Sequence, residues 1–177
     1  MKRASGRDIR ELLRAEISGP LGARWLGYGV APDELDQVAQ NAFTGPPVPP
    51  PLAQLLRRAL GAGMPEVVRL SNDPRFLLGV IPSANVMTTA EEISGFYQCL
   101  LDDGSWQGQS IFAPRSVHHA IAEQSYWEMD FTLGVPLRYG LGFMLGSKQI
   151  GPFGLDNERA FGHIGLSNTF TWADPDR

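Results

Sequence analysis

Apolar side chains recur at helical spacing near the start of the chain. They fall at intervals of three, four and eight residues and so share one helix face: Ile9, Leu12, Leu13 and Ile17. Ser5 and Asp8 have the spacing of a capping box at the start of this pattern. Together these features predict a helix that begins near Ser5 and ends at the turn over 19–22, where glycine and proline interrupt the period.

Three later segments have the same period and predict three more helices. The first covers 52–60 and ends before the glycines at 61 and 63. In the second, Thr89 and Glu92 form a capping box ahead of an apolar stripe that ends at Asp103. The third begins near Pro114, because proline is favoured in a first helical turn. The residues of the stripe are Ile93, Phe96, Tyr97, Leu100 and Leu101.

The period shortens in the last quarter of the chain and predicts strands over 139–145, 159–163 and 167–173. Helices first and antiparallel strands last indicate an α+β fold. The proline-rich loop 46–51 excludes helix and central strand, and its Pro-x-x-Pro spacing also fits a peptide ligand of an aromatic groove. We expect one domain over 1–177.

Composition narrows the class of protein. With 177 residues and 43% hydrophobic content the chain is long enough to bury a core. Its formal charge of -4 comes from interspersed acidic and basic residues, which disfavours nucleic acid as a partner. We find no run of about 18 apolar residues for a membrane span and no signal-peptide pattern, so a cytoplasmic location is the default expectation.

The sequence has no serine nucleophile paired with a lysine. A Ser-x-x-Lys pair places the amine one helical turn after the hydroxyl that it deprotonates. The lysines are Lys2 and Lys148, and the residue three positions before Lys148 is Leu145. None of the four tyrosines is followed two places later by asparagine, so a Tyr-x-Asn base is missing as well.

His163 is the strongest single candidate for chemistry, because His-x-Gly stands at the head of a predicted strand. A structural role for a lone histidine remains the alternative. Ser167 as a nucleophile with His163 as its base is disfavoured, since four residues of strand span roughly 13 Å at about 3.3 Å per residue. Gly165 permits close approach of another backbone, and an N–H beyond it suits an oxyanion.

Metal or cofactor chemistry has little support in the sequence. His119 and Glu123 lie four residues apart on a predicted helix and so are able to approach one ion, but a solvated helix face is the simpler interpretation. Cys99, the only cysteine, lies in an amphipathic stripe and is expected to fill the core. We therefore expect no metal and no cofactor.

Four segments in order resemble the serine β-lactamase-related family, which includes class C β-lactamases, penicillin-binding DD-peptidases and β-lactamase-like esterases. They are Ser18–Gly22, Pro82–Glu92, Tyr139–Phe143 and Phe161–Gly165. The resemblance implies a partial β-lactamase/transpeptidase-like fold, truncated at both ends. By resemblance, His163 and Gly165 form the wall of the pocket, the backbone N–H of Leu166 belongs to the oxyanion hole, and the strand through Ser167 lines the acyl group.

The expected function is that of the C-terminal-proximal part of a serine hydrolase that is esterase-like, because His-x-Gly replaces the Lys-Thr-Gly element of true β-lactamases. The substrate would be a small ester, amide or lactam, and the chain alone is expected to be inactive. The alternative is a non-catalytic binding or scaffold remnant of the same fold. Tyr126, Trp127 and Phe131 cluster in a loop-like stretch and are candidates for substrate contact. Exposed sheet edges are expected to favour association.

Overall fold

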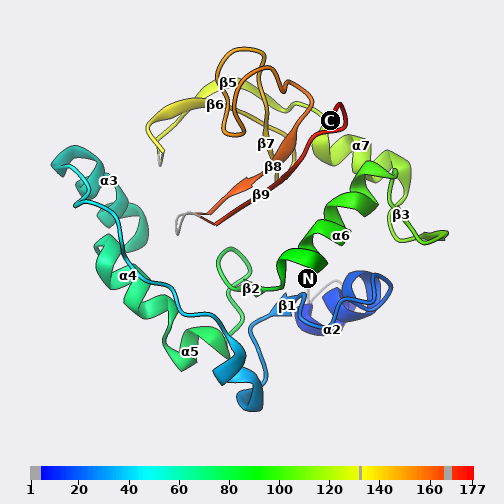
Figure 1. Ribbon diagram of the computed structural model, residues 1–177, viewed down its shortest axis with the longest axis horizontal. Helices are drawn as coiled ribbons and strands as arrows, with labels where there is room; N and C mark the ends of the chain where they lie inside the picture. Colours follow the sequence, from blue (N-terminus) through cyan, green and yellow to red (C-terminus); the bar gives the residue numbers. More distant parts are fainter. Residues whose placement is uncertain (1–4, 132, 166–168) are drawn as a thin grey trace. The chain divides into compact units, whose positions relative to one another are not determined.

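The computed structural model in Figure 1 describes residues 5–131, 133–165 and 169–177. The chain divides into two compact units. The first comprises Met1–Gly27, Thr88–Met129 and Val135–Arg177, and the second comprises Tyr28–Met87 and Asp130–Gly134. A single domain over the whole chain therefore stays a prediction.

The first unit opens with the predicted N-terminal helix, which has two parts. The α-helix α2 spans Ile9–Leu13 and continues as a π-helical segment, η1, over Arg14–Ser18. The N-cap is Asp8, whose carboxylate accepts the backbone N–H of Arg10 at 3.0 Å. The cap predicted at Ser5 is therefore wrong by three residues, because Asp8 is itself a strong cap and stands directly before the regular helix.

Two of the predicted helices are confirmed in this unit. Helix α6 spans Ala90–Leu101, and its N-cap hydroxyl on Thr89 accepts the N–H of Glu92 at 3.2 Å. Helix α7 spans Pro114–Ile121 and has proline in its first turn. Between the two helices a short hairpin pairs β3 (Ser105–Trp106) with β4 (Gln109–Ser110).

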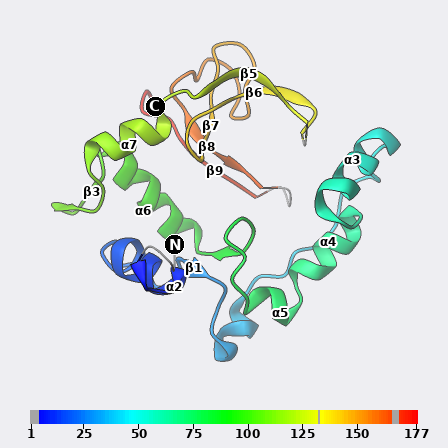
Figure 2. The same ribbon diagram turned by 180° about the vertical axis from the view of Figure 1, so that it is seen from behind.

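A five-stranded sheet forms the rest of this unit and confirms the α+β class. Its strands follow one another in chain order from one edge to the other: β5 (Ser125–Asp130), β6 (Val135–Tyr139), β7 (Met144–Leu145), β8 (Phe161–Ile164) and β9 (Phe170–Ala173). The pairs from β6 to β9 are antiparallel. Figures 1 and 2 both show α6 alongside β9, and these two elements are in contact.

The strand predicted over 139–145 is a hairpin instead of one strand. Tyr139 pairs with Met144 across the β6–β7 turn, and the Gly140 N–H donates to the Phe143 carbonyl at 2.9 Å. Gly142 has φ +87°, a left-handed conformation that a strand does not contain. The sequence pattern did not reveal this turn, because small and apolar residues alternate here as they do along a strand. The stretch holding Tyr126 was expected to be a loop and is strand β5.

Buried apolar residues from α6, α7 and the sheet make the main core of this unit. They are Tyr97, Leu100, Val117, Leu145, Phe161 and Ala173. A second cluster on the other side of α6 contains Leu21, Ala23, Leu26 and Cys99. The Glu92 carboxylate fixes this second cluster to α6, because it accepts the backbone N–H groups of Arg24 at 2.8 Å and Trp25 at 3.0 Å. Helix α6 is thus buried on two faces.

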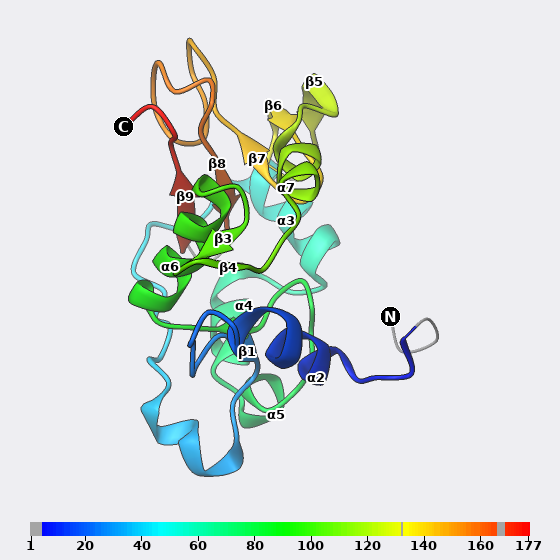
Figure 3. The same ribbon diagram turned by 90° about the vertical axis from the view of Figure 1, so that its right-hand side faces the viewer.

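The long connection from β7 to β8 is held by a buried asparagine. Asn157 Oδ1 accepts the N–H of Ser147 at 3.3 Å, and its Nδ2 donates to the Phe153 carbonyl at 2.6 Å. The Phe153 ring stacks on Trp172 of β9 with centroids 5.6 Å apart. Figure 3 shows this connection, in orange, beside the C-terminal turn, and Arg177 donates to the Asp156 carbonyl at 3.0 Å.

The second unit is mostly helical. Its helices are the 3-10 helix η2 (Pro32–Gln37), α3 (Pro50–Leu60), α4 (Met64–Ser71) and α5 (Pro74–Leu77). Strand β1 (Gly27–Tyr28), which enters this unit at Tyr28, is paired to β2 (Val86–Met87). Helix α3 begins two residues before the predicted start at Leu52, because Pro50 fits the first turn. Helices α4 and α5 were not predicted, although Pro65 and Pro74 also lie in first turns.

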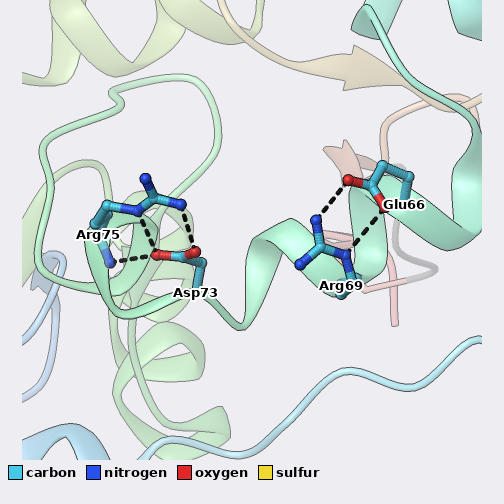
Figure 4. Close-up of polar contacts among 4 residues, drawn as sticks. All are labelled: Glu66, Arg69, Asp73 and Arg75. Atoms are coloured by element: carbon cyan, nitrogen blue, oxygen red, sulfur yellow. Dashed lines mark hydrogen bonds and ion pairs between the residues drawn. The ribbon is translucent and has the colours of Figure 1, made fainter.

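Two exposed ion pairs lie along α4 and α5 (Figure 4). Arg69 donates to Glu66 through Nε at 3.0 Å and Nη2 at 2.6 Å. Arg75 donates to Asp73 through Nε at 3.0 Å and Nη2 at 2.8 Å, while the Arg75 backbone N–H caps α5 on the same carboxylate. The side-chain and backbone hydrogen bonds from Arg75 lower the pKa of Asp73 from 3.8 to about 2.

Candidate functional site

His163 lies near the end of β8, and its side chain is exposed. Its Nδ1 is 3.0 Å from the carbonyl oxygen of Ile164. A carbonyl only accepts, so this contact requires a proton on Nδ1 and leaves Nε2 as the acceptor of a neutral ring. The histidine therefore presents a lone pair, and not an N–H, at its outer nitrogen when it is uncharged.

The β8–β9 hairpin closes beside the histidine. The N–H of Gly165 donates to the carbonyl of Thr169 at 2.7 Å, so this N–H already has a partner within the chain. The N–H proposed for the oxyanion hole is the next one, on Leu166. Leu166 and Ser167 lie outside the described residues.

Thr171 stands directly opposite His163 in the β8–β9 register. The Tyr97 hydroxyl reaches this threonine from α6, at 3.2 Å from its carbonyl oxygen and 3.0 Å from Oγ1. Burial raises the pKa of the Tyr97 phenol, and its hydrogen bond to Thr171 only partly offsets that effect, so the hydroxyl stays protonated near neutral pH. Sequence reasoning assigned Tyr97 only to an apolar stripe and missed this contact.

A groove of about 570 Å³ runs between α6 and β9 on this unit. Its walls include Ile93, Tyr97 and Leu101 from the helix and Phe170 and Trp172 from the strand. The groove therefore adjoins the strand pair that carries His163. No sequence signal located it, because its walls meet only when α6 packs on β9.

Tyr126 and Trp127, the two aromatic candidates for substrate contact, lie on β5. Strands β6 and β7 separate β5 from β8, which is roughly 14 Å at about 4.8 Å per strand. The Tyr126 side chain is 69% exposed, and its ring meets Trp127 edge to face at 6.4 Å. Trp127 has φ +52°, an uncommon conformation for an aromatic residue. The sheet order thus brings His163, Gly165 and Thr171 close together and leaves Tyr126 and Trp127 of β5 apart from them.

The alternative metal site does not form among the described residues. Helix α7 ends at Ile121, before Glu123, so His119 and Glu123 are not on consecutive turns of one helix. Glu123 instead accepts Arg138 Nη2 at 2.8 Å. Within the described ranges no group of three or more histidine, cysteine, aspartate or glutamate side chains is arranged to hold an ion.

Cys99 has no access to a substrate. Its residue is fully buried against the second cluster of the core, and burial raises the pKa of its thiol. A reactive cysteine needs a lowered pKa and an open approach. The thiol therefore acts as a small apolar group. Across the part of the chain that the structure describes, no helix has the length and apolar character needed to cross a membrane.

Comparison with known proteins gives consistent results along the whole chain. A family model described as Beta-lactamase matches residues 1–177. The protein described as Esterase/beta-lactamase LipL of Mycobacterium tuberculosis (strain ATCC 25618 / H37Rv) is 25% identical over 186 aligned positions, which cover 97% of this chain and 41% of that protein.

Solved structures agree on the fold. A penicillin-binding protein homolog from Caulobacter crescentus superposes with a TM-score of 0.75 and 27% identity, over 99% of this chain and 46% of that one. A family VIII carboxylesterase gives 0.79 and 25%, covering 99% and 45%. EstA from Arthrobacter nitroguajacolicus Rue61a gives 0.72 and 26%, covering 99% and 47%. The chain spans less than half the length of each of these relatives.

The resemblance noted in the sequence and the partial fold are therefore confirmed. The family model spans every residue, and the solved relatives share the mixed helix and antiparallel-strand fold over 99% of the chain. The chain belongs to the β-lactamase family.

Proposed function

We propose that these residues form the part of an esterase-like serine hydrolase that carries the His-x-Gly strand, and that its nucleophile lies elsewhere in the protein. The observation that supports this most directly is the placement of His163 near the end of β8, two residues before Gly165, whose N–H donates to the Thr169 carbonyl. The family and its esterase relatives agree with this assignment.

The nucleophile must be external because the chain offers no activated serine. Neither lysine follows a serine at the spacing of a Ser-x-x-Lys pair, and no tyrosine is followed by the asparagine of Tyr-x-Asn. Lys148 forms an exposed ion pair with Glu158, with Nζ 3.3 Å from the carboxylate. Without a base that removes its proton, a serine hydroxyl is a weak nucleophile.

In the proposed reaction, the external serine attacks the ester carbonyl, the bond from the carbonyl carbon to the alcohol oxygen breaks, and the alcohol leaves with the proton of the serine. Water then hydrolyses the acylated serine, which releases the carboxylic acid and restores the serine hydroxyl. His163 forms one wall of the pocket, and the Leu166 N–H donates to the oxyanion. Such a donor lowers the barrier by about 3 to 4 kcal/mol, but only when a nucleophile attacks beside it. Ser167 lines the acyl group, while Tyr126 and Trp127 contact only the far end of a long substrate.

Esters are the proposed substrate class, ahead of amides and lactams. By the resemblance to the family, His163 replaces the lysine of the Lys-Thr-Gly element of true β-lactamases. When its ring is neutral, the contact of Nδ1 with the Ile164 carbonyl leaves the lone pair of Nε2 on the outer side. A lone pair repels a carboxylate, so an uncharged ester suits this wall better than an anionic lactam.

The rival proposal is a binding or scaffold protein that keeps the fold without chemistry. The groove beside β9 gives this reading its support, since a groove binds ligands with or without a nucleophile. The two proposals differ in one respect that is easily measured, which is the presence of a reactive serine in the native protein that contains these residues.

The test is hydrolysis of p-nitrophenyl butyrate together with labelling by a fluorophosphonate. We expect the purified 177-residue chain to show neither turnover nor label. The native protein that contains the chain should be labelled on a serine outside it and should lose activity when His163 is replaced by alanine. A labelled serine inside the chain would refute the external nucleophile, and an unlabelled, inactive native protein would favour the scaffold.

A further inference from the structure

Tyr97 links α6 to both strands of the hairpin that carries His163. Its ring packs against Phe161 of β8 with centroids 6.0 Å apart and meets Phe143 edge to face at 6.4 Å. Its hydroxyl contacts Thr171 of β9 through two atoms, at 3.2 Å and 3.0 Å. Tyr97 is only 7% exposed, so water does not substitute for these contacts.

Both contacts of the Tyr97 hydroxyl are hydrogen bonds in only one arrangement of the two hydroxyl protons. The carbonyl of Thr171 only accepts, so the single proton of Tyr97 is donated to it. The Thr171 hydroxyl then donates to the Tyr97 oxygen across the 3.0 Å contact. Each donor has an acceptor, and the pair forms a closed, reciprocal link between α6 and β9.

This link lies directly opposite His163. The Gly165 N–H bonds to the Thr169 carbonyl, and hydrogen-bonded pairs alternate along an antiparallel ladder. His163 and Thr171, two positions further along each strand, are therefore also a hydrogen-bonded pair. The Thr171 carbonyl thus accepts hydrogen bonds from both the His163 backbone N–H and the Tyr97 hydroxyl. The side chains of His163 and Thr171, which stand opposite each other, lie on the same face of the sheet.

We infer that Tyr97 and Thr171 are positioning residues for the His163-x-Gly165 element, acting through the β8–β9 register and not by touching substrate. The inference rests on the proposed function, because it concerns where that element is held during ester hydrolysis. An oxyanion donor must meet the transition state and not the bound ester, so a small displacement of β8 lowers kcat more than it raises KM.

The first test needs no activity and uses amide hydrogen exchange of the full chain by NMR. Tyr97→Phe removes only the hydroxyl, and we expect the His163 N–H to exchange about fivefold faster, the equivalent of the roughly 1 kcal/mol that one hydrogen bond contributes. Cys99→Ala is the matched control, because Cys99 lies on the same helix but packs against the second cluster. Equal acceleration at His163 in both variants would show a general loss of stability and overturn the inference.

The second test measures ester hydrolysis by the native protein that contains the chain. Tyr97→Phe removes both hydrogen bonds of the link and should lower kcat about fivefold, while Thr171→Val removes only the bond that its hydroxyl donates and should lower kcat less. Neither substitution should change KM by more than about twofold. The double variant should lose no more than Tyr97→Phe alone, because that substitution already removes the hydrogen bond that Thr171→Val removes. Thr171→Ser keeps the hydroxyl and should retain the kcat of the native protein, and Cys99→Ala should also leave kcat unchanged.

Additive losses in the double variant, or a rise in KM without a fall in kcat, would overturn the positioning role. A native protein that hydrolyses no ester would instead contradict the proposed function. In that case the exchange measurement still decides whether Tyr97 and Thr171 hold the β8 strand.

Discussion

Gly162 determines how closely the two strands of the site approach each other. A Cβ built on this residue would meet the carbonyl oxygen of Thr171, and it would lie 2.5 Å from the Cβ of Trp172. The Trp172 ring is also stacked on the ring of Phe153. The strand β9 therefore has little freedom to move away from a larger residue at this position.

Gly162→Ala should reduce the free energy of unfolding by about 1 to 3 kcal/mol, the usual cost of overpacking a close contact. Gly45→Ala is the matched control, because its Cβ would meet nothing within 4 Å and its φ is not positive. That control should change stability by less than about 0.5 kcal/mol. Urea unfolding of the two variants tests this, and equal midpoints would contradict the close approach.

Glu92 is a second residue whose contribution to stability comes from its position in the fold, since the glutamate beside it lacks the same contacts. Its carboxylate accepts two backbone N–H groups, from Arg24 and Trp25, and so ties the segment after the first helix to α6. Glu91, its neighbour in the same helical turn, is exposed. The two glutamates therefore form a natural comparison.

Glu92→Ala should cost about 1.5 to 3 kcal/mol of unfolding free energy, the range for hydrogen bonds to a charged group. Glu91→Ala removes only a favourable charge near the helix N-terminus and should cost about 0.3 to 1 kcal/mol. Thermal unfolding of both variants measures the difference. A larger loss for Glu91→Ala would mean that the carboxylate of Glu92 does not stabilise this segment.

At the scale of elements, helix α5 depends on a single cap. Asp73 accepts the Arg75 backbone N–H and both side-chain contacts of the same arginine. These bonds favour the charged carboxylate and hold its pKa at about 2, below the ordinary 3.8. A carboxylate with a lowered pKa stabilises the folded state above its unfolded pKa, and that contribution is lost as pH falls from about 4 to about 2.

Arg75→Gln should raise the pKa of Asp73 toward its ordinary value, because the largest cause of the shift is the side-chain hydrogen bond from Arg75. Titration of the Asp73 carboxyl carbon by NMR measures this. Arg69→Gln is the control, since its main effect should be on Glu66, whose pKa Arg69 lowers. An unchanged Asp73 pKa in Arg75→Gln would show that the Arg75 side chain does not cause the shift.

At the scale of the whole molecule, strand β9 is the feature most relevant to association with other chains. It is the last strand of the sheet in the part of the chain that the structure describes, and Phe170 on it is 57% exposed. An edge strand with exposed apolar side chains is a site of pairing with other chains, and a charged residue on it discourages that pairing.

We therefore expect the purified chain to associate as its concentration rises, and Phe170→Lys to reduce this association. Leu141→Lys is the control, because Leu141 is 50% exposed but lies in the β6–β7 turn, outside the strands. Sedimentation velocity over a concentration series measures both variants. Association that responds equally to the two substitutions would reflect general solubility and not the edge of β9.

Local patterns in the sequence were enough to predict helices and short motifs of this protein. The period of apolar residues and the Thr89 cap were enough for α6, because a helix depends on contacts within a few residues. The His-x-Gly segment and the missing Ser-x-x-Lys pair were also legible, since each is a short motif. The hairpin over 139–145 was not, because a turn and a strand there share the same alternation of small and apolar residues.

Only the tertiary structure decided which distant residues meet. It separated Tyr126 and Trp127 from His163 by two strands, and it brought Tyr97 to Thr171, 74 residues away in the chain. A sequence pattern records which face of an element is apolar, but sheet order and register depend on long-range pairing. The sequence therefore specified the family and the His-x-Gly element, and the packing of α6 on β9 decided how that element is held.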